Sequence, residues 1–405
     1  MLVTALQPPK GSASVHLDAL RGLAAFSVLA SHWRDAFFVD YTALPHHNPL
    51  QAAAYIFCSL GHQWVIVFFV MSGYLVGGSV LRSRQQGRWQ WGAYLLTRLT
   101  RLYVVLLPAL VIGGLADWAG MHLTASSTIY TGVSGMHFLA HNACQTLTPL
   151  VFLQTLLFLQ NLHAPEFGSN SALWSLANEF WYYLAFPVLM IAFARAQKWG
   201  IRVVCIVALT VWALFAGLQV VLLGIPWLLG ALIAVLPAFP ARSPLWRGFA
   251  IFVAMALFGG GMALFGSVQG IGNALHFPAT GSVYGIPFTD LPLSLLVSLL
   301  IWVTLHCATA PVPAIYAWTA RRAAASSYTL YLIHIPILVF IKASLHLPRL
   351  APGWHGLLVS LAVLVAVLLC AQGVYELFEK NTAQVRNWLK PYGMGQQAVS
   401  QSGPA

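Results

Sequence analysis

The sequence predicts an all-α polytopic membrane protein with about ten transmembrane helices. Of its 405 residues, 59% are hydrophobic and 7% are charged, whereas a soluble globular chain has about 25% charged residues. Apolar runs near the length of about 20 residues that a bilayer-crossing helix needs alternate with short basic clusters. The net charge of +11 is therefore typical of cytoplasmic loops beside a lipid bilayer, and nucleic-acid binding is rejected.

The expected spans follow from apolar length and from the excess of Lys and Arg in cytoplasmic loops. They are residues 17–33, 55–79, 102–120, 173–194, 203–221, 223–239, 248–266, 291–309, 324–345 and 356–377. A further span at 136–162 would place the basic cluster around Lys198 outside, so we expect a re-entrant or interfacial segment there. Both termini are expected in the cytoplasm, with one transmembrane domain over 1–390 and a short disordered tail over 391–405.

Three ionisable residues interrupt the first span: Asp18, Arg21 and His32. Such a side chain costs about 2.5–3.5 kcal/mol at membrane depth unless it faces a bundle interior or an aqueous cavity. Arg21 and His32 are eleven residues apart, so on a helix they share one face about 16 Å apart, and Asp18 lies on that face too. His32 is the candidate general base because imidazole titrates near neutrality; the alternative is a hydrogen-bonded interfacial histidine.

Several strings together resemble the acyltransferase family 3 membrane proteins. They are the Arg21–His32 spacing after Leu17-Asp18, FFVMSG at 68–73, LWSLANEFWYYLAFP at 173–187 and SYTLYLIHIP at 327–336. The resemblance implies an inner-membrane enzyme that moves an acyl group, most often acetyl, from cytoplasmic acyl-CoA to a hydroxyl of an extracytoplasmic glycan, lipid-linked sugar or macrolide. It implies that His32 is catalytic, as base or transient acyl carrier, and that Arg21 is required. Asn381 departs from the family, which usually has Pro there.

Under this resemblance, the phosphates and thioester of acetyl-CoA are expected to meet arginines. Arg21 suits bidentate phosphate recognition, with an ion pair to Asp18 as the alternative; Asp18 is a catalytic candidate through that pairing. Arg98 and Arg101 lie three residues apart on one helical face and are candidates for binding the CoA phosphates. The alternative is that they only set the membrane topology or contact lipid headgroups. Ser72 and Gly73 are further candidates for the acyl-CoA site. The alternative is that these small residues only allow close helix packing.

Glu179 is a further catalytic candidate because it lies in an aromatic run, where an unpaired carboxylate would be expensive. We expect it to bind a partner side chain or a sugar hydroxyl. His334 is expected to be a packed residue. The acceptor is expected to bind the outer segments 121–172 and 267–290 directly, with a separate periplasmic partner enzyme as the alternative. The groove candidates are Tyr130, His137, Asn142, Trp174, Asn273 and Tyr284.

The rival function is a secondary transporter that uses Asp18, Arg21 and His32 as a proton relay. No paired inverted halves are visible in the sequence, which weakens that alternative. The sequence also has no Walker A loop, no HExxH and no GxSxG, and its five cysteines are isolated. We therefore expect no bound metal and no nucleotide-driven pump.

Overall fold

The computed structural model describes residues 11–124, 127–194, 197–240, 243–274, 282–283, 286–287 and 289–393. Its helices are α1 (Gly11–Phe37), α2 (Pro49–Ser59), α3 (Gly61–Ser72), α4 (Gly78–Gln85), α5 (Trp91–Leu123), α6 (Ala143–Thr146), α7 (Pro149–Leu156), α8 (Leu173–Ala192), α9 (Trp199–Ile233), α10 (Pro244–Ala274), α11 (Asp290–Cys307), α12 (Ala314–Ala325), α13 (Ser327–Ser344), α14 (Trp354–Leu377) and α15 (Thr382–Gly393). Single turns are η1 (Tyr41–Ala43), η2 (Gly73–Gly77), η3 (Ser127–Thr131), η4 (His137–Leu139) and η5 (Glu379–Asn381). Two-residue strands β1 (Ser282–Val283) and β2 (Ile286–Pro287) pair antiparallel.

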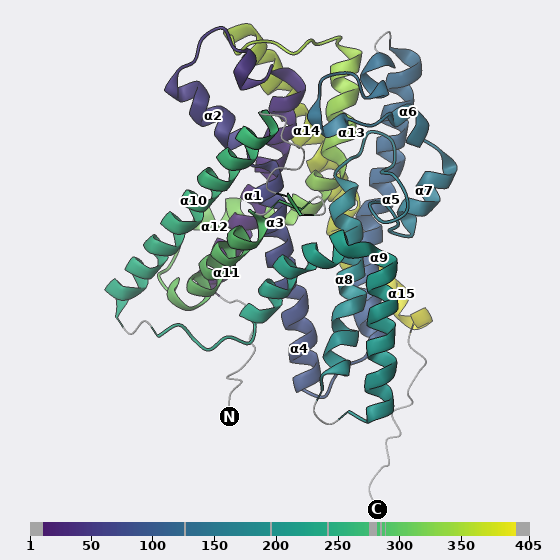
Figure 1. Ribbon diagram of the computed structural model, residues 1–405, viewed down its shortest axis with the longest axis vertical. Helices are drawn as coiled ribbons and strands as arrows, with labels where there is room; N and C mark the ends of the chain where they lie inside the picture. The colour runs from purple at the N-terminus through teal and green to yellow at the C-terminus, as the bar shows by residue number, and fades with distance from the viewer. Residues whose placement is uncertain are drawn as a thin grey trace, which may run out of the picture.

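Eight stretches of the described chain are long and apolar enough to cross a membrane. They are Gly11–Phe37, Gly61–Gln85, Trp91–Leu123, Trp199–Ile233, Pro244–Ser267, Asp290–Cys307, Ser327–Ser344 and Trp354–Lys390. Figure 1 shows α2 and α6 at one end of the helical bundle and α4 at the other, as expected if the segments after the first and third spans share one side of the bilayer. The predicted all-α polytopic membrane fold is confirmed.

The spans predicted at 203–221 and 223–239 correspond to α9, which consists of two helical pieces that meet at a sharp kink at Gly217 rather than at residue 222. Gly217 has a φ of 81°, a left-handed conformation that favours glycine. The residues after the bend pack across α3 and η2. The predicted span at 173–194 corresponds to α8, whose apolar run is interrupted by Asn178 and Glu179. The count of ten spans and the cytoplasmic termini stay predictions.

The segment between α5 and α8 contains only short helical elements in its described part, and the longest has eight residues. Eight helical residues span about 12 Å, too little to cross a bilayer. Buried Asp117 ties this segment to α5, because its carboxylate accepts hydrogen bonds from the amide and hydroxyl of Ser169, both 2.7 Å long. The side chain of Asn170 donates to the Leu332 carbonyl of α13 at 2.7 Å. This arrangement agrees with the predicted non-spanning segment.

The centre of the bundle is formed by α3 and α13, which pack against α1. Within the most apolar windows, 72% of the residues of each are buried, against 17% for α9 and α10, whose exposed apolar side chains suit contact with lipid. Two glycines bring α9 close to α3. A Cβ on Gly73 would lie 1.8 Å from the Trp227 carbonyl oxygen, and one on Gly230 would lie 1.9 Å from that of Val70. Small residues at such contacts let helix backbones approach closely.

Candidate active site

His32 of α1 lies against a second histidine, His334 of α13. The two rings are stacked with their centroids 5.2 Å apart. Phe138 of η4 closes another side of His32, edge-on at 5.0 Å. Three elements that are distant in the sequence therefore meet at the residue predicted to act as the base.

His334 is held in one tautomer by its own helix. Its Nδ1 lies 3.0 Å from the Leu330 carbonyl oxygen and 2.8 Å from that of Tyr331, and a ring nitrogen facing two acceptors must carry the proton. Its Nε2 is then the lone-pair nitrogen, and it is buried with no hydrogen-bond partner among the described residues. The sequence predicts only that His334 is a packed residue. It is packed, but it also presents an unused basic nitrogen beside His32, and no local signal could have revealed this pairing across about 300 positions.

One side of α13 continues from the histidine pair toward the other end of the bundle. Tyr328, Tyr331 and His334 follow one another at intervals of three residues, so they lie along one side of the helix over about 9 Å. The hydroxyl of Tyr331 lies 2.7 Å from that of Ser175 on α8. Both tyrosines are close enough to Glu179 to interact with its charge. We call these three residues the α13 polar face.

Glu179 is satisfied by hydroxyl groups from its surroundings. The hydroxyl of Ser72 donates a short hydrogen bond to the Glu179 carboxylate, and that of Tyr183 donates another of 2.5 Å. The Ser72 oxygen in turn accepts from the indole nitrogen of Trp227 at 3.2 Å. Glu179 thus has hydrogen-bond partners among neighbouring side chains, which was one of its two predicted alternatives. Two predicted site residues, Ser72 and Glu179, are in direct contact.

Arginines gather at the far end of the α13 polar face. Arg21 pairs with Asp18 at 3.3 Å, as one of the sequence alternatives proposed, but both side chains are about a quarter exposed rather than buried. The Nε of Arg21 has no hydrogen-bond partner in the described part of the chain. The charges of Arg101 and Glu379 act on Arg21, and Glu379 accepts hydrogen bonds from the amide and hydroxyl of Thr329 at 3.1 and 2.6 Å. Glu379 thus joins this group.

Arg98 and Arg101 both lie over aromatic rings. The guanidinium of Arg98 is 5.7 Å from the ring centre of Tyr94 and 5.9 Å from that of Tyr183, and it donates to the Ser79 hydroxyl at 2.9 Å. Arg101 lies 5.9 Å from the ring centre of Tyr328. Cations held by aromatic faces rather than by carboxylates keep most of their hydrogen-bond donors for a ligand.

Gly73 follows Ser72 at the start of the π-helical turn η2, where α9 leaves no space for a side chain. Packing therefore accounts for a glycine at this position, which was the alternative to a donor-site role. Single π-helical turns are frequent at functional sites. The predicted contact of Gly73 with acyl-CoA stays a prediction.

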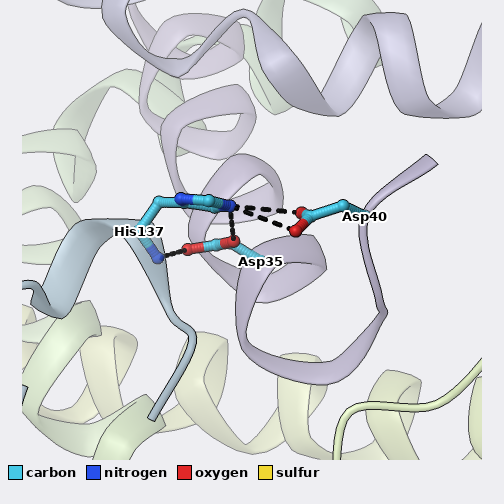
Figure 2. Close-up of side chains that lie close together, drawn as sticks. All are labelled: Asp35, Asp40 and His137. Carbon is cyan, nitrogen blue, oxygen red and sulfur yellow. Dashed lines mark hydrogen bonds and ion pairs between the residues drawn. The ribbon is translucent and has the colours of Figure 1, made fainter. Parts of the chain in front are cut away.

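Beyond His32, the end of α1 carries a charged cluster that the sequence analysis did not single out. Figure 2 shows Asp35, Asp40 and His137 pointing toward one another. The buried carboxylate of Asp35 accepts from the backbone amides of His137 and Phe138 at 2.6 and 3.3 Å, which fixes the turn that places Phe138 on His32. Acidic and basic residues directly after His32 were the available signal.

Two arginines neutralise this outer cluster. Arg349 lies 3.0 Å from Asp40 and 3.4 Å from Asp35, and Arg34 lies 3.2 Å from Asp40. Partial burial tends to raise the pKa of Asp40, but the charges and hydrogen bonds of Arg349 and His137 outweigh it and lower that pKa below its ordinary value. The ligand-like grouping of Asp35, Asp40 and His137 is therefore an ion-pair network, because the cations that a metal would have to displace already occupy both carboxylates.

The four predicted acceptor residues whose side chains the structure describes lie in different surroundings. Tyr130 is fully buried against Gly120 of α5, so its expected place in such a groove is wrong. His137 is exposed in the outer cluster, Trp174 lies parallel to the His62 ring, and Asn142 caps α6. The side chains of Asn273 and Tyr284 lie outside the described residues.

Residues 15–376 match the family model of acyltransferase family 3, which is described as an acyltransferase domain. No curated protein and no solved structure matches the chain. The match covers both histidines and the arginines of the predicted acyl-CoA site, Arg21, Arg98 and Arg101. It favours an acyltransferase over a transporter. The chain therefore belongs to acyltransferase family 3 and is a multi-pass membrane acyltransferase.

Proposed function

We propose that the protein transfers an acyl group, which we expect to be acetyl, from cytoplasmic acyl-CoA to a hydroxyl of a glycan or lipid-linked sugar on the outer side of the inner membrane. Donor and acceptor lie on opposite faces of the bilayer, so the reaction needs a polar route through the bundle. The α13 polar face is the observation that carries this proposal, because it joins the arginines near the predicted cytoplasmic side to the histidines near the outer side.

In this proposal the donor enters from the arginine end. Arg21, Arg98 and Arg101 bind the phosphates of CoA, since guanidinium groups recognise phosphate oxygens in a bidentate manner. The acyl arm extends along α13 past Tyr328 and Tyr331 toward His334. Ser72 and Glu179 line this route from α3 and α8 and keep their hydroxyl and carboxylate mutually satisfied.

The chemical step takes place at His32. Its neutral imidazole removes the proton from the acceptor hydroxyl, and the oxygen attacks the thioester carbonyl carbon. A carbon–oxygen bond forms, the carbon–sulfur bond breaks, and the imidazolium returns its proton to the CoA thiolate. His334 lies beside this site with an unprotonated and unpartnered Nε2, which offers an acceptor to a hydroxyl of the bound substrate without adding a charge.

The test uses sealed proteoliposomes that contain the purified protein in one enriched orientation. Acetyl-CoA with a radiolabelled acetyl group is supplied on the side of the arginines, and a neutral oligosaccharide is enclosed on the other side. We expect labelled ester on the enclosed sugar and free CoA on the donor side. Labelled acetyl-CoA that crosses intact, with no ester formed, would instead support transport. Palmitoyl-CoA in a parallel reaction distinguishes acetyl transfer from transfer of longer chains.

A further inference from the structure

We infer that the outer side of the protein holds a binding site for an oxyanion on the acceptor, next to the charged cluster at the end of α1. A pocket of about 310 Å³ lies between the turn η3 and its following loop, the end of α13 and residues 347–349. That volume is at the lower end of small-molecule pockets. Its lining includes two cations, Lys342 and Arg349, together with Ser134 and the exposed Val133.

Lys342 is the residue that marks this pocket as an anion site. Its side chain is 3% exposed, and a buried ammonium is costly unless its charge and its donors are satisfied. Its Nζ donates one hydrogen bond of 2.6 Å to the Leu347 carbonyl and lies 5.3 Å from the ring centre of Phe37. An ammonium has three donors, and this is its one hydrogen bond to the residues that the structure describes, so two donors remain for a ligand.

The surrounding charges leave Lys342 without a carboxylate of its own. At this end of the bundle, the ion pairs among the described residues join Arg34, Arg349 and His137 to Asp35 and Asp40. None of them includes Lys342, on which Asp35, already paired with Arg349, acts only from beyond ion-pair distance. Three cations therefore face two carboxylates in this part of the chain. The Ser134 hydroxyl is buried and has no hydrogen-bond partner in the described residues, which adds a donor for an anion's oxygen atoms.

The pocket is close enough to the histidine pair for one ligand to reach both. Lys342 and His334 are eight residues apart on α13, which corresponds to about 12 Å along the helix. The segment that lines the pocket continues into Phe138, which touches His32. An acidic oligosaccharide or a sugar linked to a lipid phosphate could thus present a hydroxyl to His32 while its carboxylate or phosphate is held by Lys342. This inference rests on the proposed function for the identity of the ligand as acceptor.

Binding and transfer are measured separately with protein in nanodiscs of neutral lipid. The binding probes are a fluorescent hexuronic-acid disaccharide, its carboxyl-reduced neutral form, and a short-chain polyprenyl phosphate. We expect the wild-type protein to bind at least one anionic probe and to ignore the neutral sugar, and the probe that binds identifies carboxylate or phosphate as the source. Lys342→Gln should weaken that binding by about tenfold, while Lys198→Gln, which removes an exposed lysine elsewhere, should not.

A second pair of variants avoids the buried position. Val133 is 81% exposed at the pocket, so Val133→Glu and Val133→Gln should both fold. Only the glutamate should weaken anion binding, by about threefold, because it places a like charge at the opening. Equal binding of neutral and anionic probes, or no effect of either Lys342→Gln or Val133→Glu, would overturn the anion site. Charge-dependent binding without any acyl transfer would leave the site standing and overturn the proposed function instead.

Discussion

Arg21 and Arg349 stand at opposite ends of the site and use their guanidinium groups differently. Arg349 donates four hydrogen bonds, to the carbonyls of Phe38 and Gly135 and to the carboxylates of Asp35 and Asp40. To the residues that the structure describes, Arg21 donates one, to Asp18 at 3.3 Å, and its Nε has no partner there. A guanidinium offers five N–H donors. Arg349 is therefore nearly saturated as a structural link between loops, whereas Arg21 retains donors for a ligand.

The two ends of the bundle differ in the same way in how their charged side chains are paired. At the outer end, the ion-pair network holds the backbone turn that places Phe138 on His32, and its charges are mutually compensated. At the inner end, Arg98 and Arg101 lie over aromatic faces and form no ion pair within the described residues, and Glu379 acts on Arg101 only from beyond ion-pair distance. The inner cations are thus suited to a charged donor, and the outer pairs are suited to holding the catalytic surroundings in place.

The largest expected effect is at His32, where the two ends meet. Replacing His32 with Ala should lower kcat by about 10²–10⁴-fold, because the acceptor hydroxyl loses its general base, while the KM for acetyl-CoA should stay nearly constant. Acetyl transfer by purified protein measures both values. His355→Ala, at an exposed position on α14, is the matched control. Transfer at the wild-type rate by the His32 variant would remove this residue from the mechanism.

Effects of intermediate size are expected for the two arginines, and each should change a different measured quantity. Arg21→Lys should raise the KM for acetyl-CoA by about tenfold, because an ammonium cannot form a bidentate contact with phosphate, and should leave thermal stability unchanged. Arg349→Lys should leave that KM unchanged but lower the free energy of unfolding by about 2 kcal/mol, since it leaves buried carbonyl or carboxylate oxygens unpaired. If both variants changed the same quantity, the assignment of separate roles would be wrong.

The smallest expected effect concerns pH at the outer cluster. The pKa of Asp40 is lowered in the folded protein, so its contribution to stability is complete above its ordinary pKa of 3.8 and is lost as pH falls through the lower folded value. Because the Asp40 side chain is 42% exposed, solvent screening limits this contribution to below about 1 kcal/mol. Thermal unfolding of wild type and Asp40→Asn should differ by a constant amount from pH 5 to 8 and converge in stronger acid. A difference that changed between pH 5 and 8 would contradict this assignment to Asp40.

Local patterns in the sequence were sufficient for the parts of the site that lie on one helix. Arg21 and His32 are carried by α1, because the length of its apolar run and the spacing along it are local properties. The same reasoning indicated that Glu179 needs a partner, since a carboxylate within an apolar helix is costly in any membrane fold. The distribution of basic residues likewise predicts that the segment 136–162 does not span the membrane.

Only the tertiary structure decided which residues meet across helices. His334 faces His32, Ser72 faces Glu179, and Arg349 reaches Asp35, and each pair is separated by more than 100 positions. The position of the kink at Gly217 was likewise open, because the apolar run over 203–239 contains other glycines and prolines at which it could break. After the kink, Trp227 and Gly230 pack against the backbone of α3 and η2, and no single segment of the sequence contains that packing energy.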